Sequence, residues 1–167
     1  MHRLLLLTCL AFVAALAGCS NAPEPMAPTP AVNRFTVAGS LYPETVIEVS
    51  KAAVPLNVNT SLGIQQVTLN GIINELDTMN LTLSWDGVEP GSYPWSGTKS
   101  SPRYIRMVIR TKDGRRIDMQ PDPSAPIGET IVEGSDDQYV YGRFYGNLRG
   151  AGGSLNITHG YFRSVRP

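Results

Sequence analysis

The sequence predicts an all-β protein, an antiparallel β-sandwich of about seven to nine short strands, with a small β-barrel as the alternative. From residue 34 onward, apolar and polar residues alternate with a period of two, which is typical of strands with one buried face. Gly, Pro, Asn and Asp interrupt this alternation every ~8–12 residues. No long stretch combines helical spacing with helix caps. Prolines at positions 55, 94, 102 and between 121 and 126 favour the sandwich, because they indicate irregular crossovers between two sheets.

Four strands are expected in the first half of this region. Two short ones fall at Phe35–Gly39 and Val46–Val49. The overlapping segment Thr45–Ala53 is rich in β-branched residues, which argues against a short helix there. Longer strands are expected at Val67–Ile73 and Met79–Trp85. In the last of these, apolar residues occupy the odd-numbered positions and polar residues the even-numbered ones, so one face is expected to be buried.

A hairpin is expected at the start of the second half. The strand Ile105–Arg110 precedes Asp113 and Gly114, and an Asp-Gly pair favours a tight turn because both residues tolerate positive φ. The partner strand returns from Arg115. A further strand is expected at Glu129–Glu133.

The two C-terminal strands, expected at Tyr139–Leu148 and Leu155–Val165, share a short motif. It reads YGRF at 141–144 and HGYF at 159–162. The glycine-rich residues 149–154 predict a flexible hairpin loop, so the two strands are expected to pair antiparallel. In each motif the glycine permits a bulge or lets an aromatic ring lie over the backbone.

The first nineteen residues have the pattern of an export signal. After an arginine at position 3 comes an apolar run of about fourteen residues, shorter than the ~20 that a spanning helix needs. The run ends in LAGC at residues 16–19. This segment resembles the lipobox of bacterial lipoproteins.

The resemblance implies that residues 1–18 are a signal peptide and that Cys19 is lipidated, with palmitate-type acyl chains that anchor the protein in a membrane. An uncleaved anchor helix is the alternative. Ser20 resembles the outer-membrane class, which implies a location at the outer membrane, facing the periplasm. Residues 19–33 then form a tether whose four prolines favour an extended spacer or a flexible linker. Residues 34–167 are expected to form a single all-β domain.

Composition and motifs argue against several classes of chemistry. The chain carries 14 Lys and Arg against 14 Asp and Glu, so its net charge gives no support to nucleic-acid binding. Without the leader, Cys19 is the only cysteine and His159 the only histidine, which leaves no disulfide within the monomer and no usual zinc site. Nucleophile-elbow and phosphate-loop motifs are missing. We therefore expect no enzymatic activity, no cofactor and no metal.

A basic segment is the main candidate for a binding surface. Between positions 99 and 116, seven Lys and Arg residues accompany one acidic residue, Asp113. A positive stripe on one hairpin could contact an envelope protein, an acidic glycan or a lipid phosphate. The alternative is an exposed edge whose charges discourage aggregation. The candidate residues are Arg103, Arg106, Arg110, Arg115 and Arg116.

Aromatic residues provide a second set of candidates, for a groove that binds sugar or peptide. The same residues would also suit the core of a small β domain. They are Tyr93, Trp95, Tyr139, Tyr141 and Tyr145.

The leading hypothesis is a lipid-anchored cell-envelope protein with a non-enzymatic binding, structural or accessory role. One alternative is a lipocalin-like carrier, which needs an apolar cavity of ~300 Å³ or more. A less favoured alternative is a carboxylate-based hydrolase, which needs two convergent acids, one of them with a raised pKa.

Overall fold

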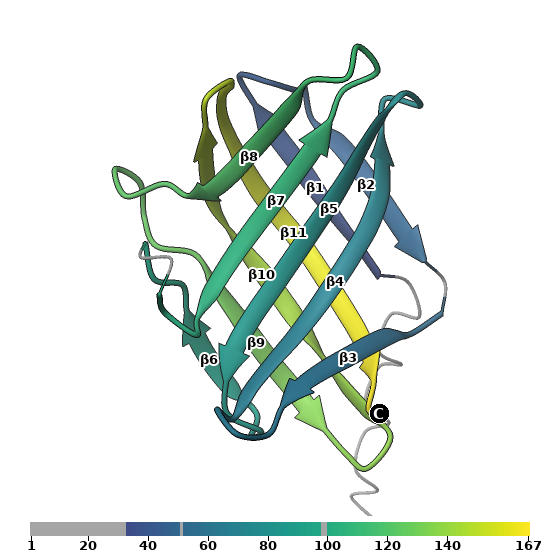
Figure 1. Cartoon of the computed structure of the whole chain (residues 1–167), viewed down its shortest axis with the longest axis vertical. Coiled ribbons are helices and arrows are strands. Elements are labelled where there is room, and N and C mark those ends of the chain that lie inside the picture. Colours follow the sequence, from purple (N-terminus) through teal and green to yellow (C-terminus); the bar gives the residue numbers. More distant parts are fainter. Residues whose placement is uncertain (1–32, 51, 98–99) are drawn as a thin grey trace, which may run out of the picture.

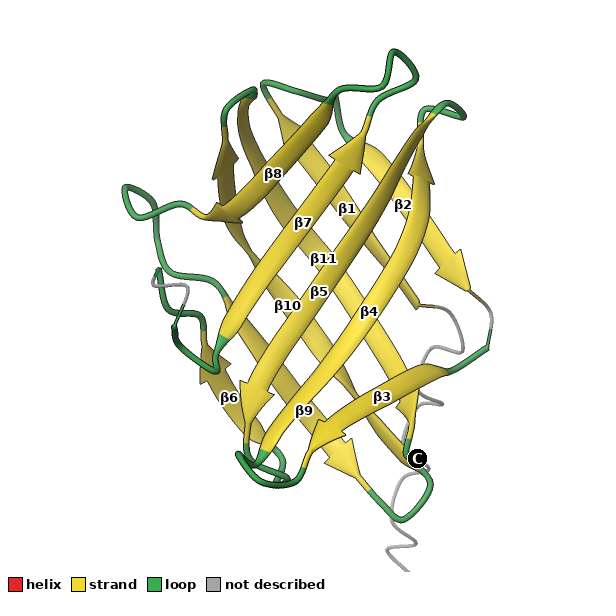
Figure 2. Cartoon of the chain, viewed as in Figure 1, coloured by secondary structure: helices red, strands yellow, loops and turns green. Residues whose placement is uncertain are grey.

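A computed structural model describes residues 33–50, 52–97 and 100–167. The signal peptide, Cys19 and the tether up to residue 32 lie outside the described residues. In the described part of the chain, eleven strands and their connecting loops account for the fold, and it contains no helix (Figure 2). The predicted all-β class is therefore confirmed. Among these same residues, no helix is long and apolar enough to cross a membrane.

The strands follow the chain in order. They are β1 (Asn33–Gly39), β2 (Thr45–Ser50), β3 (Val54–Asn59), β4 (Ile64–Ile73), β5 (Asp77–Asp86), β6 (Gly91–Pro94), β7 (Tyr104–Arg110), β8 (Arg116–Pro121), β9 (Glu129–Ser135), β10 (Tyr139–Gly150) and β11 (Gly153–Val165).

All eleven strands belong to one sheet that folds into two layers. In Figure 1, β3, β4, β5, β7 and β8 lie in front and cross β1, β2, β9, β10 and β11 behind. The layers are joined at two places, where the end of β11 pairs with β3 and where β10 pairs with β8. Within the rear layer, β11 pairs with both β1 and β10. The pairing therefore forms a closed circuit, which runs in the order β11, β3, β4, β5, β7, β8 and β10 and then returns to β11. Only the short β11–β3 contact is parallel.

Two of the strands, β3 and β6, differ from the expectation of loops at these positions. Each contains a proline, Pro55 or Pro94, that we expected to mark a crossover. Proline cannot donate to a ladder and is therefore confined to edges and strand ends. Pro94 ends β6, the last strand in the sheet order, and Pro55 lies at the short parallel contact with Val165. The strand count therefore exceeds the expected seven to nine.

The core lies between the two layers and follows the predicted alternation. In β5, Met79, Leu81, Leu83 and Trp85 are at most 3% exposed. Aromatic rings link the layers, since the centroid of Trp85 lies 5.5 Å from that of Phe162. Burial of this one face is the main source of stability of the fold.

The C-terminal hairpin pairs as predicted, with Gly150 opposite Gly153. Both motif glycines lie against aromatic side chains. A Cβ added at Gly160 would come within 2.8 Å of the Phe144 ring, and one at Gly142 within 3.1 Å of the Phe162 ring. The close approach of ring to backbone therefore requires glycine at these positions.

A β-bulge interrupts this hairpin in the middle of β11. Phe144 pairs with Gly160 and Gly146 with Ile157, so Tyr145 lies opposite two residues, Thr158 and His159. His159 adopts a φ of 50°, a left-handed conformation that is uncommon for residues other than glycine. Such bulges redirect side chains, and here two successive residues face outward.

The hairpin between β7 and β8 also forms, but its turn differs from the expected one. Gly114 has a φ of 84°, whereas Asp113 does not adopt positive φ. Gly114 N–H donates to Thr111 O over 2.9 Å, and Thr111 N–H donates to Arg115 O over 3.0 Å. These bonds define a three-residue loop with the glycine in the left-handed position, one of the common hairpin connections.

Candidate functional site

The basic hairpin is largely neutralised by aspartates. Arg106 forms two hydrogen bonds with Asp118, one of them 2.7 Å from Nε to Oδ1. Arg116 Nη2 lies 3.5 Å from the same carboxylate. Arg103 pairs with Asp86.

At the turn, Arg115 Nε lies 3.0 Å from Asp113 Oδ2. Arg110 makes no ion pair with any residue that the structure describes. Four of the five candidate arginines thus have an acidic partner. The positive stripe expected from the sequence becomes a mixed-charge surface. The alternative of an exposed edge does not apply either, because β7 pairs with β5 and β8 pairs with β10, so both strands lie inside the sheet.

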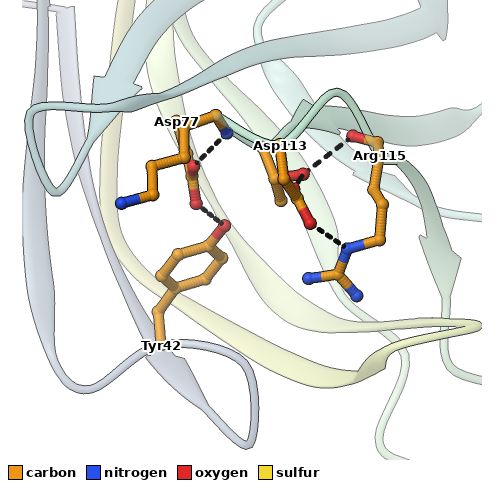
Figure 3. Close-up of polar contacts among 6 residues, drawn as sticks. Tyr42, Asp77, Asp113 and Arg115 are labelled. Atoms are coloured by element: carbon orange, nitrogen blue, oxygen red, sulfur yellow. Dashed lines mark hydrogen bonds and ion pairs between the residues drawn. The ribbon is translucent and has the colours of Figure 1, made fainter.

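A cluster of polar groups connects the β7–β8 turn with the β1–β2 loop and the start of β5 (Figure 3). Tyr42 donates to Asp77 Oδ2 over 2.7 Å, and the backbone N–H of Lys112 donates to Asp77 Oδ1 over 2.9 Å. Burial and the bond to Asp77 raise the pKa of Tyr42. Asp77 therefore ties the β1–β2 loop to the β7–β8 turn, and we interpret the cluster as structural.

The aromatic candidates separate into two groups. Tyr93 and Trp95 are buried, and the indole N–H of Trp95 donates to Thr130 Oγ1 over 2.9 Å, so both residues belong to the core. Tyr139, Tyr141 and Tyr145 lie on the outer face of β10, and Tyr145 is 44% exposed. Only this second group can line a surface groove.

Arginines accompany these tyrosines on the outer face of the rear layer. The Arg163 guanidinium lies 4.0 Å from the Tyr139 ring centroid, and that of Arg34 lies 5.6 Å from the Tyr161 centroid. Such stacking is a favourable cation–π contact. We call this surface the Tyr–Arg face. Its residues are Arg34, Tyr139, Tyr141, Arg143, Tyr145, Tyr161 and Arg163.

A groove of about 400 Å³ crosses the Tyr–Arg face at the β11 bulge. Tyr145 and Tyr161 contribute aromatic rings to it, and Asn147, Asn156 and Thr158 contribute neutral polar groups. Arg143, His159, Ile127 and Pro126 complete the side-chain lining, together with backbone and parts of buried residues. The mixture of aromatic surface with a few polar groups is typical of ligand-binding sites.

The side chain of Tyr145 is held in place by its cross-strand neighbour on β9. Its hydroxyl donates to Glu129 Oε1, and Ser92 Oγ donates to Glu129 Oε2. The bonds from Ser92 and Tyr145 lower the pKa of Glu129, and the same carboxylate raises the pKa of Tyr145. Glu133, on the same face of β9, forms an ion pair of 2.5 Å with Arg143. The groove thus has a preorganised polar frame.

Protonation of Glu129 is expected to loosen this frame at acid pH. Because the folded-state pKa of Glu129 lies below its ordinary value of 4.5, its contribution to stability is full above that value and is lost as the pH falls through the folded-state pKa. Between about pH 5 and pH 3 the free energy of unfolding should therefore fall more steeply in the wild type than in Glu129→Gln. Urea denaturation at a series of pH values measures both slopes. Equal slopes would contradict the expectation.

No group of three or more His, Cys, Asp or Glu side chains among the described residues is placed to hold a metal ion. Asp136 Oδ1 instead accepts the backbone N–H groups of Gln138 and Tyr139, as in a solvated turn.

Comparison with protein-family models, with curated proteins and with solved structures finds no match. The fold and the groove define the class as an all-β domain with a candidate binding site on its outer face.

Proposed function

We propose that this chain is a lipid-anchored cell-envelope protein whose β domain binds a partner through the Tyr–Arg face. The anchor is Cys19, at the end of a lipobox-like segment, and residues 20–31 form the spacer. Two or three acyl chains are sufficient for stable membrane attachment. The observation that carries the binding role is the groove at the β11 bulge, where an exposed Tyr145 is fixed by Glu129.

The carrier alternative is less well supported because side chains from both layers meet in the interior. Leu81 and Leu83 of the front layer, and Phe144 and Ile157 of the rear layer, are at most 1% exposed. The groove at the bulge lies on the outside of the sheet instead. A carrier of apolar ligands would need an open interior.

The hydrolase alternative is also less well supported. A general acid needs a carboxyl group whose pKa is raised. The hydrogen bond from Arg103 lowers the pKa of Asp86, and the bonds from Ser92 and Tyr145 lower that of Glu129. These carboxylates are therefore suited to holding neighbouring groups in place.

Replacement of Cys19 by serine tests the anchor. The variant lacks the thiol that would carry the lipid, so we expect it to leave the membrane fraction almost completely when cells producing the full chain are fractionated. Cys9→Ser is the matched control, because Cys9 lies within the leader and should be dispensable. Retention of Cys19→Ser in membranes to the wild-type level would contradict lipid anchoring.

A further inference from the structure

We propose that the groove at the β11 bulge binds the glycan strands of the cell wall, with a pyranose ring stacked on Tyr145. This inference rests on the proposed function, which places the domain in the bacterial envelope. It goes beyond that function by naming the chemical class of the ligand and the residues that recognise it.

Tyr145 provides the stacking surface. Tyr145 is 44% exposed, and its ring is already fixed because its hydroxyl donates to Glu129, which also accepts a bond from Ser92. A ring that is fixed before binding loses little conformational entropy when a ligand covers it. The apolar C–H face of a pyranose is complementary to such a ring, and Ile127, at 72% exposed, extends the apolar surface beside it.

Neutral polar groups surround this surface in positions that suit sugar hydroxyls. Asn156 Nδ2 donates to Asn147 Oδ1 over 2.8 Å, which orients both amides. Each amide retains further donor or acceptor capacity, so together they can meet hydroxyls that act in both roles. The bulge adds Thr158 and His159 as outward side chains directly opposite Tyr145. His159, the residue with the strained φ, therefore lies in the groove, where its side chain would contact the glycan.

The charge of the groove selects among envelope polymers. Arg143 is the one Asp, Glu, Lys or Arg side chain in the groove lining, and it is already paired with Glu133. Glu129, the cross-strand partner of Tyr145, lies at the hydroxyl end of its ring. Phosphorylated glycans such as lipopolysaccharide cores would meet these carboxylates at an energetic cost. A glycan with little charge along its backbone suits the groove better, and the cell-wall strands are the polymer of this kind next to the proposed anchor.

Binding of peptide-free glycan strands tests the proposal. The strands used are N-acetylglucosamine oligomers, which have the acetamido-pyranose backbone of the cell-wall glycan without charge, and they are titrated against the full-length protein in detergent, with saturation-transfer NMR and calorimetry as readouts. We expect the wild type to bind and Tyr145→Ala to bind about tenfold more weakly, which corresponds to about 1.4 kcal/mol. Tyr145→Phe keeps the ring and should stay closer to the wild type. Tyr104→Ala is the matched control, because Tyr104 lies on the outer face of β7, outside both the groove and the Tyr–Arg face.

A second variant separates binding from folding. His159→Gly removes the imidazole and relieves the positive φ, so it should be at least as stable as the wild type while binding the strands several-fold more weakly. The proposal is overturned if the wild type does not bind the strands, if Tyr145→Ala binds them as tightly, or if phosphorylated core oligosaccharide binds more tightly. None of these results affects the fractionation of Cys19→Ser, so the two proposals fail independently.

Discussion

Gly142→Ala is expected to destabilise the protein by about 3 kcal/mol or more, the upper end of what overpacking costs in a close-packed interior. A Cβ at this position would lie 1.9 Å from the carbonyl oxygen of Ile131 and 3.1 Å from the Phe162 ring. The first contact is with backbone of the neighbouring strand β9, so no side-chain rotation can relieve it. Strands β9 and β10 would have to separate where the ladder already shifts register.

The control for this change is Gly91→Ala. In the edge strand β6 the nearest atom to an added Cβ is in Tyr93, at 4.0 Å, which is ordinary contact. Urea denaturation followed by tryptophan fluorescence gives both free energies of unfolding. We expect Gly91→Ala to remain close to the wild type. A Gly142→Ala variant as stable as Gly91→Ala would show that the β9–β10 pairing is not as described.

Trp85→Ala is expected to cost about 3–5 kcal/mol, the usual range for loss of a large buried aromatic side chain. The indole is 0% exposed and packs against Phe162, which is 2% exposed, so its loss leaves a cavity between the layers. The same urea titration measures this effect, with Trp95 as the remaining fluorophore.

A matched pair of conservative changes tests the packing at finer resolution. The Trp85 indole N–H has no hydrogen-bond partner among the described residues, whereas that of Trp95 donates to Thr130 Oγ1. Both indoles are buried. Phenylalanine removes the N–H in each case, so Trp95→Phe should cost about 1 kcal/mol more than Trp85→Phe. The reverse order would contradict these indole environments.

The sequence allowed most of the fold to be predicted because period-two patterns depend only on neighbouring residues. In β5 the alternation from Met79 to Trp85 was sufficient to assign the apolar face, although Ser84 on the other face is also buried. The close packing of aromatic rings on Gly142 and Gly160 followed from the repeated motif. The strands containing Pro55 and Pro94 were missed, because proline in a strand is tolerated only where a hydrogen-bond partner is not needed, and that depends on sheet order.

The candidate site was predictable only in part, for a related reason. The arginines of the basic hairpin were identified, but the acid that neutralises Arg103 is Asp86, 17 residues away on another strand. Asp118 could have been placed on the face of Arg106 by counting outward from the Asp113-Gly114 turn. No local pattern marks the β11 bulge, which depends on the register of β11 against its neighbours.

For the groove itself, the alternation along β10 was the available signal. It places Tyr145 outward, while the buried Tyr93 and Trp95 occupy inward positions near the end of a short edge strand. The partner that fixes Tyr145, Glu129, is 16 residues away on β9. The alternation therefore indicates an exposed tyrosine but not the contacts that make it a rigid binding surface.

The intact mass of the protein extracted from the cell envelope tests the central claim, attachment through Cys19, most directly. Cells producing the full chain are fractionated, and the membrane-extracted protein is analysed by mass spectrometry with sequencing of its N-terminal peptide. We predict a chain that begins at Cys19 and carries a diacylglyceryl group, with or without an additional amide-linked acyl chain. A chain that retains residues 1–18, or one that begins at an unmodified Cys19, would contradict the proposal.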